Sequence, residues 1–173
     1  MFAKLSTALA VLCLVTGASF AQGAKPTDPQ IAHIAYTAGQ IDIEAAKQAL
    51  KKSKNKEVRA FAQDMVRDHS AVNKQALALV KKLKVTPQDN DTSKALVKQA
   101  DAKRAELAKL SGKAFDKAYV DNEVAYHKTV NGALENTLIP SASNAELKSL
   151  LQTGLKVFQG HEQHAEMVDS KLK

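Results

Sequence analysis

Three histidines occupy the apolar faces of separate segments of the sequence. His69 and His161 each continue a stripe of apolar residues spaced three and four apart, and His127 follows Glu123 by one helical turn. An imidazole on a core-facing surface must find hydrogen-bond partners, so three of them on three helices favour one shared site. Three neutral imidazoles and a carboxylate suit a single transition-metal ion such as zinc, copper or iron.

The carboxylates near these histidines disfavour oxidase-type di-iron chemistry. Di-iron bundles place a glutamate three residues before a histidine on two of their helices. The residues at that spacing here are Val66 and Phe158, neither of which binds metal. Glu44 and Glu123 remain as single carboxylates on their helices, and Met65 is a soft neighbour if the ion is copper.

Other polar residues close to the three histidines receive lesser roles. His164 is expected at the rim of the site, and His33 at the surface or in ordinary packing. Asp68 directly precedes His69, but adjacent residues on a helix do not face each other. We therefore expect Asp68 to be a solvated carboxylate or one that bridges to another helix.

Helical periodicity covers almost the whole chain after its first 27 residues. Apolar residues recur at steps of three and four between clear breaks, which predicts helices over residues 28–52, 55–84, 92–110, 113–138 and 143–172. The fourth helix is expected to end before Ile139 because a residue that precedes a proline avoids the helical conformation. Ser143 and Glu146 predict a capping box at the start of the last helix.

The lengths of the connections predict the topology. Short breaks join the first two helices and the last two, so each pair forms an antiparallel hairpin. Residues 85–112 are long enough to run the full length of the molecule. We therefore predict an all-α, ferritin-like four-helix bundle with a fifth, shorter helix in its crossover connection.

Helix geometry gives each candidate ligand a height in such a bundle. At about 1.5 Å of rise per residue, His69 and His127 lie level, whereas Glu44 and His161 lie about 9 Å higher. Side chains lean toward the N-terminus of their own helix, so the two pairs lean toward each other. The sequence thus predicts a metal site formed by the following five residues: His69, His127, His161, Glu44 and Glu123.

A metal-free interpretation remains open from the sequence. In it each histidine is satisfied separately in the core by Tyr119, Tyr126 or a carboxylate. The chain is then an envelope stress or interaction protein whose lysine-rich helix ends meet an anionic envelope surface or a protein partner. Nothing in the sequence assigns an enzyme, since nucleophile motifs and phosphate-binding loops are absent. Nucleic-acid binding lacks the interleaved aromatic residues that it needs.

The composition and the first residues indicate an exported, helical protein. The chain has 173 residues, 25 Lys and Arg against 18 Asp and Glu, and only 5% aromatic residues. Residues 1–21 combine Lys4, an apolar run and small residues before Ala21, as secretory signal peptides do. Residues 22–173 then form one domain in the periplasm or outside the cell, with no transmembrane span. Because the only cysteine is Cys13, the mature chain has none.

Several segments carry a resemblance to one bacterial family. They are residues 61–69 (FAQDMVRDH), residues 115–119 (FDKAY) with the later His127, and residues 155–161 (LKVFQGH). In this order, they resemble the family called domain of unknown function 4142. The resemblance implies a ferritin-like, exported protein, and some members of the family carry an outer-membrane label.

The resemblance also bears on the site. It places the family's histidines at His69, His127 and His161. Residues 41–44 (IDIE) are similar to the family's acidic stretch, with Asp42 in place of the commoner glutamate. No activity is implied, because the family has none firmly assigned.

Overall fold

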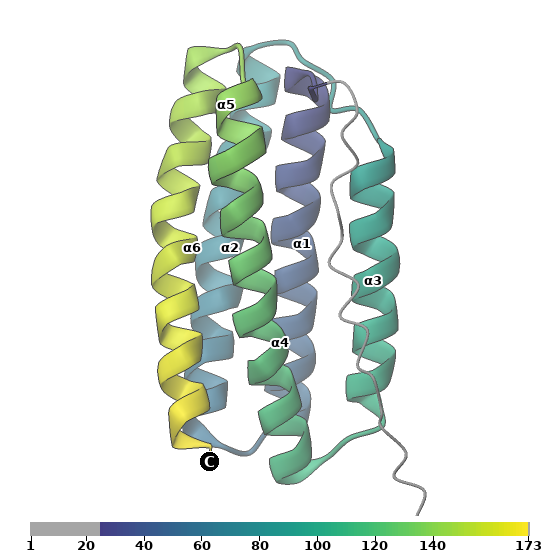
Figure 1. The fold of residues 1–173 in the computed structure, drawn as a ribbon, viewed down its shortest axis with the longest axis vertical. Helices are drawn as coiled ribbons and strands as arrows, with labels where there is room; N and C mark the ends of the chain where they lie inside the picture. The colour runs from purple at the N-terminus through teal and green to yellow at the C-terminus, as the bar shows by residue number, and fades with distance from the viewer. Residues whose placement is uncertain (1–24, 173) are drawn as a thin grey trace, which may run out of the picture.

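Four long helices lie side by side along the molecule, and a fifth covers one side of them (Figure 1). The four are α1 (Asp28–Lys52), α2 (Lys56–Lys82), α4 (Gly112–Ala133) and α6 (Ala145–Lys171). The fifth, α3 (Asp91–Ala108), packs mainly on α1. This computed structural model describes residues 25–172 and contains no strand within them. The predicted signal peptide, residues 1–21, lies outside the described residues and so does Cys13.

The helices follow each other as a hairpin, a crossover and a second hairpin. α1 runs down and α2 runs up in Figure 1, joined by residues 53–55, and α4 and α6 form the other antiparallel pair. α3 runs down the outside of the bundle and brings the chain back to the lower end, where α4 begins (Figure 1). This is the ferritin-like four-helix bundle with a shorter helix in its crossover, so the predicted fold class is confirmed.

Side-chain caps explain where helices begin. Asn55 accepts hydrogen bonds from the backbone N–H groups two and three residues later, at 2.9 and 3.3 Å. Asn144 caps α6 in the same manner, so the capping box predicted at Ser143 is wrong. The N–H groups of Ser143 and Asn144 instead donate to the Asp28 carboxylate, each at 2.8 Å. This contact ties the start of α6 to the start of α1.

The fourth helix runs further than the sequence predicts. After α4 the chain makes one π-helical turn, η1 (Leu134–Leu138), and a short helix, α5 (Ile139–Ser141). In the π turn, the N–H of Ile139 donates to the carbonyl of Leu134, five residues back. Pro140 follows directly in α5, so the helical backbone continues through the proline. The predicted end before Ile139 is therefore three residues early.

A layer of buried polar side chains separates two apolar clusters inside the bundle. The lower cluster contains, among others, Phe61, Met65, Phe115, Tyr119, Val120, Ala165 and Val168. The upper cluster contains Ile31, Ile34, Leu134, Leu138, Leu147, Leu151 and Phe158, with smaller neighbours. The polar layer lies between them along each helix, and its main members are Asp42, His69, Glu123, His127 and His161. The candidate ligands are thus in the middle of the core.

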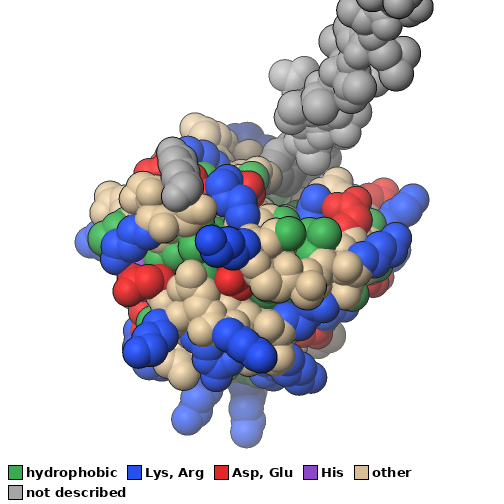
Figure 2. All heavy atoms as spheres, turned by 90° about the horizontal axis from the view of Figure 1, so that it is seen from below, with side chains coloured by type: hydrophobic (Ala, Val, Ile, Leu, Met, Phe, Trp, Pro, Cys, Tyr) green, Lys and Arg blue, Asp and Glu red, His purple; other side chains and the backbone are tan. Residues whose placement is uncertain are grey.

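The surface is basic at the lower end of the bundle. Seen from below, Lys and Arg side chains surround this end (Figure 2). Lys51 and Lys52 in the last turn of α1 and Lys171 in the last turn of α6 lie where cations offset the helix dipole. Among the described residues, no helix is both long enough and apolar enough to cross a membrane.

Candidate metal centre

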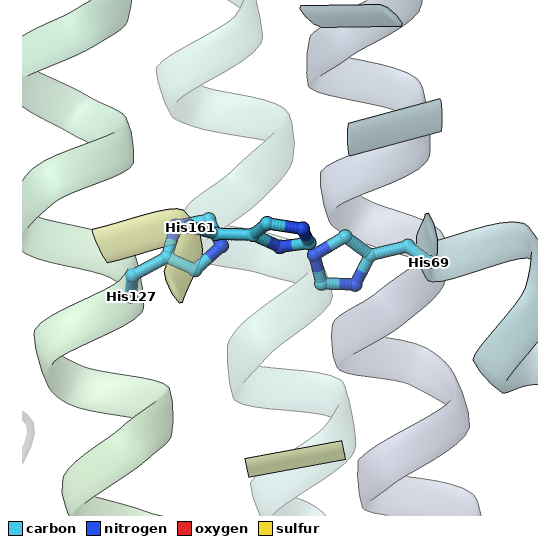
Figure 3. A group of neighbouring side chains, drawn as sticks. All are labelled: His69, His127 and His161. Atoms are coloured by element: carbon cyan, nitrogen blue, oxygen red, sulfur yellow. The ribbon is translucent and has the colours of Figure 1, made fainter. Parts of the chain in front are cut away.

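Three imidazoles from three helices meet in the polar layer (Figure 3). His69 comes from α2, His127 from α4 and His161 from α6. Their ring centroids are 5.8 Å (His69 to His127), 5.1 Å (His69 to His161) and 5.6 Å (His127 to His161) apart. Each ring offers a nitrogen within 4.8 Å of a nitrogen of the other two. The structure therefore brings together the three histidines that the sequence singled out.

The three rings are buried by both apolar clusters. The exposed fractions of His69, His127 and His161 are 3%, 1% and 6%. The ring of Phe158 lies flat on that of His69, with 4.5 Å between centroids and 5° between planes. Gly154, one turn before Phe158, lies against the same ring, and a Cβ there would be in ordinary van der Waals contact with it at 3.4 Å. Water is thus largely excluded from the imidazoles on the side of the upper cluster.

Helix α1 contributes Asp42 to the site, and the predicted ligand Glu44 does not join it. Asp42 Oδ2 lies 3.0 Å from His69 Nε2 and 3.3 Å from His127 Nε2, and its side chain is fully buried. The Glu44 side chain is 40% exposed and forms an ion pair with Arg104 of α3. Side chains two positions apart on a helix point in directions that differ by about 200°, so Asp42 and Glu44 cannot both face the core.

A signal for Asp42 was present in the sequence. Asp42 follows Ala38 by four residues and precedes Ala45 by three, so it lies within the apolar stripe of α1. Both alanines are buried. Burying a carboxylate without a partner is costly, so Asp42 on a core face is as strong a candidate ligand as the three core-face histidines.

Glu123 lies next to Asp42 in the same layer, on α4. Its side chain is 1% exposed, and its Oε2 lies 3.9 Å from His127 Nδ1. Asp42, Glu123 and His127 each offer one ligand atom within 4.8 Å of the others, so they form a second group that shares His127 with the first. The structure therefore places Glu123 beside the histidine cluster, as the sequence predicts.

Two of the imidazoles have one nitrogen fixed from outside the cluster. His127 Nδ1 lies 2.9 Å from the carbonyl oxygen of Glu123, to which its N–H donates a hydrogen bond. His161 Nε2 lies 3.0 Å from Asp68 Oδ2, so Asp68 bridges α2 and α6. Arg67 holds Asp68 in turn, through two hydrogen bonds of 2.7 and 2.9 Å. The sequence did not identify Asp68 as part of the site, although a helix-bridging role was one of its two expected roles.

The inward-facing atoms have no such partners. The approaches of Asp42 to His69 and His127 lack the alignment of hydrogen bonds. Among the described residues, these buried atoms have no hydrogen-bond partner: both carboxylate oxygens of Asp42, both nitrogens of His69, Nε2 of His127, Nδ1 of His161 and Oε2 of Glu123. Such a concentration of unpartnered buried polar atoms is costly in an ordinary core.

The two carboxyl groups take opposite charge states. Burial raises the pKa of Asp42, but the neighbouring His69 and His127 outweigh burial and hold this pKa well below its ordinary value. Burial together with the charge of Asp42 raises the pKa of Glu123 well above its ordinary value. Asp42 is therefore the more readily ionised of the two carboxyl groups.

Burial also keeps two of the imidazoles neutral. It lowers the pKa of His127, against the opposing attraction of Asp42. It lowers the pKa of His161 to about 4, although the hydrogen bond to Asp68 acts in the opposite direction. A neutral imidazole has one lone pair, and in both residues the outer contact leaves that lone pair on the inward nitrogen.

The remaining candidates lie outside the cluster. His164 Nδ1 is 3.6 Å from Asp64 Oδ2, and its ring stands edge-on to Phe61 at 5.2 Å, which places it at the rim as expected. The Tyr126 hydroxyl donates to the carbonyl oxygen of Ala38 at 2.9 Å. The Tyr119 hydroxyl has no partner among the described residues. Neither tyrosine satisfies a histidine, but carboxylates, the other partners named in the metal-free interpretation, lie close to two of them: Asp68 is 3.0 Å from His161 and Asp42 is 3.0 Å from His69.

The fold and the polar layer together define the class of protein: a ferritin-like helical bundle with a buried cluster of histidines and carboxylates at mid-height. The chain belongs to the family described as domain of unknown function DUF4142, whose model matches residues 14–168. This confirms the resemblance carried by the three segments of the sequence. No curated protein matches the chain.

Two solved structures share the fold. One is a DUF305 protein from Streptomyces coelicolor, with 13% identity and a TM-score of 0.70 over 83% of this chain and 91% of that chain. The other is a DUF305 fragment from Deinococcus radiodurans, with 14% identity and a TM-score of 0.71 over 85% of this chain and 99% of that chain. At these identities, the likeness concerns the fold alone.

Proposed function

We propose that this protein is an exported metal-binding protein that holds one transition-metal ion, of the zinc, copper or iron class, inside its helical bundle. The ligands are His69, His127, His161 and Asp42. The observation that carries the proposal is the convergence of imidazole nitrogens and a carboxylate whose inward atoms have no hydrogen-bond partner among the described residues. An ion that accepts their lone pairs removes the cost of burying them.

The outer contacts support this ligand set. Histidines that bind metal usually donate their other N–H to a carboxylate or a backbone carbonyl, which fixes the ring and its tautomer. His161 has the Asp68 carboxylate in this position, and His127 has the carbonyl of Glu123. Three nitrogens and one oxygen are typical ligands of a tetrahedral zinc ion, and imidazoles also suit copper and iron.

The same contacts favour one ion over two. The two candidate groups share His127. Its Nδ1 is engaged by the carbonyl of Glu123, so only Nε2 is free to bind metal. One imidazole nitrogen binds one ion, and the group of Asp42 and Glu123 alone offers too few ligands for a second resident ion.

Export is part of the proposal and rests on the sequence. The signal-peptide pattern of residues 1–21 supports a periplasmic or secreted location. A cysteine-free mature chain fits an oxidising compartment, where imidazole and carboxylate ligands are not oxidised as thiolates are.

Asp42 and Glu44 provide a matched test of the ligand set. We expect Asp42→Asn to weaken zinc binding by more than ~100-fold, because it removes a charged ligand. The loss of a hydrogen-bond partner of a ligand costs roughly 10- to 100-fold, and the loss of the ligand itself should cost more. Glu44→Gln removes the same charge two residues away and is expected to leave the affinity within about twofold. Competition titration with a chromophoric chelator measures both. Equal affinities for the two variants would contradict the assignment of Asp42 as a ligand.

Asp68 and Asp64 provide a second matched pair, this time for the outer contacts. Both lie on α2 and bond to Arg67, but Asp68 contacts His161 and Asp64 faces His164. We expect Asp68→Asn to weaken metal binding by roughly 10- to 100-fold, since His161 loses the acceptor that orients it. Asp64→Asn is expected to bind as the wild type does. The same competition titration measures the zinc affinity of both variants. A lower affinity in Asp64→Asn than in Asp68→Asn would refute the role of Asp68 as the residue that orients His161.

One observation favours a metal-free alternative. The distances from Asp42 Oδ2 to His69 and His127, 3.0 and 3.3 Å, are also those of a carboxylate between two imidazoles in a buried ion pair. The protein is then an envelope stress or interaction protein whose histidines are structural and whose basic lower end meets an anionic surface or a protein partner. Elemental analysis of the untagged protein separates the two functions, because only the first yields stoichiometric metal.

A further inference from the structure

A cleft on one side of the bundle reaches the polar layer. Its volume is about 230 Å³, and it lies between α3 and the pair formed by α1 and α4. The apolar side chains of Ile41, Ala100 and Leu107 line its sides, and Lys103 and Arg104 belong to its α3 wall. Asp42 and Glu123 line it from the inside. The cleft is therefore the place where the carboxylate side of the candidate site comes closest to the outside.

We propose that the metal ion enters and leaves through this cleft, and that Asp42 and Glu123 form a transit site for a divalent cation at its inner end. This inference rests on the proposed function. Both carboxyl groups are 1% exposed, and both have oxygens without a hydrogen-bond partner among the described residues. Carboxylate oxygens accept cations that still carry part of their water. Asp42 then remains bound while the histidines replace the water.

The other sides of the site offer poorer routes. Above the histidines lies a cavity of about 60 Å³ lined almost wholly by apolar side chains, and the Phe158 ring on His69 separates it from the imidazoles. A hydrated ion would lose its water there without compensation. Below, the lower cluster is closed by side chains such as Phe61, Met65 and Tyr119, all fully buried.

In the gap between α2 and α6, the carboxylate that a cation would meet is already engaged by a neighbouring side chain. Asp68 is the group that reaches from the surface to His161 on this side, and its side chain is 25% exposed. Both of its oxygens are held by the Arg67 guanidinium, which also bonds to Asp64. A cation that approached here would meet a carboxylate already engaged by Arg67, whereas oxygens of Asp42 and Glu123 at the inner end of the cleft have no hydrogen-bond partner among the described residues.

Helix α3 is held weakly enough to act as a movable cover. Its buried residues are only Ser93 and Leu107. Polar contacts at its C-terminal half hold it to α1: the carbonyl of Arg104 accepts from Gln48 at 2.9 Å, and that of Ala108 accepts from Lys52 at 2.7 Å. The ion pair between Glu44 and Arg104 joins the same two helices beside the cleft. Elements with few buried apolar contacts open at low free-energy cost, which permits exchange of the ion.

Loading kinetics test the route separately from the affinity. To measure loading, zinc chloride is mixed with the metal-free mature protein in a stopped-flow instrument. To measure release, the zinc-loaded protein is mixed with an excess of chelator. We expect Glu123→Gln to slow both loading and release by roughly tenfold, the effect of about 1.4 kcal/mol on each barrier, so that their ratio, the Kd, changes less than either rate. We expect Ala100→Trp, which fills the cleft, to slow loading by a similar factor.

The control for the filled cleft lies on the same helix. Ala102 of α3 is exposed and does not line the cleft, so Ala102→Trp is expected to load at the wild-type rate. Wild-type loading rates for both Glu123→Gln and Ala100→Trp, with zinc still bound by the wild type, would overturn the route and leave the proposed function standing. A wild-type protein that binds no zinc would overturn both.

Discussion

A double variant, His69→Ala with His127→Ala, is expected to lose stoichiometric metal binding. Two of the three imidazoles disappear, and Asp42 loses the two nitrogens that lie 3.0 and 3.3 Å from its Oδ2. One imidazole and one carboxylate cannot complete the three or four ligands that hold a zinc ion in proteins. Elemental analysis of the untagged protein after gel filtration measures the loss: about one ion per chain in the wild type and close to none in the variant.

The control removes the same number of histidines from outside the cluster. His33→Ala with His164→Ala leaves the polar layer intact, because His164 lies at the rim beside Asp64 and His33 lies at the groove between α1 and α3. This variant is expected to keep the full complement of metal. Circular dichroism checks that both variants remain helical. Retention of metal by the folded His69→Ala, His127→Ala variant would contradict the assigned site.

Removal of the ion is expected to lower the melting temperature of the wild type strongly. An ion that binds only the folded state adds about 4 kcal/mol to the free energy of unfolding when it is present at roughly 1,000 times its Kd. For a domain of about 150 residues, this corresponds to roughly 8–16 °C. The structural reason is the polar layer, whose inward atoms lack partners among the described residues unless an ion binds them. Scanning calorimetry with excess zinc and with a chelator measures the shift.

The double histidine variant supplies the control for this experiment. Without the site, its melting temperature is expected to be the same in zinc and in chelator. The metal-free alternative predicts that the wild type also melts at one temperature in both conditions, since the ion pair of Asp42 with the imidazoles needs no metal. A shift of less than about 2 °C in the wild type would therefore count against the metal site.

The fold was predictable from the sequence because its signals are local. Apolar spacing, the caps and the length of the crossover together give the five helices and their order. The errors occurred where a tertiary contact or an unusual turn decides the outcome. The Asp28 carboxylate accepts a hydrogen bond from the N–H of Ser143, a residue far away in the sequence. The π turn lets the helix continue past Pro140. Neither has a strong local signature.

The candidate site was predictable in part, for a similar reason. Periodicity placed His69, His127 and His161 on core faces, and helix rise placed them near one level. Height along the bundle alone favours Glu44, whereas direction around the helix favours Asp42, because one residue differs from the next by about 100°. Asp68 was harder to assign, because its partner His161 belongs to another helix. Height along a bundle and direction around each helix must both agree before a ligand is assigned.

The most direct test of the metal site is anomalous diffraction from crystals of the mature protein grown with zinc, recorded on both sides of the zinc absorption edge. We expect one peak per chain in the polar layer, about 2.0–2.2 Å from nitrogens of His69, His127 and His161 and from a carboxylate oxygen of Asp42. A polar layer without a peak, or peaks confined to surface residues such as His164, would contradict the proposed function.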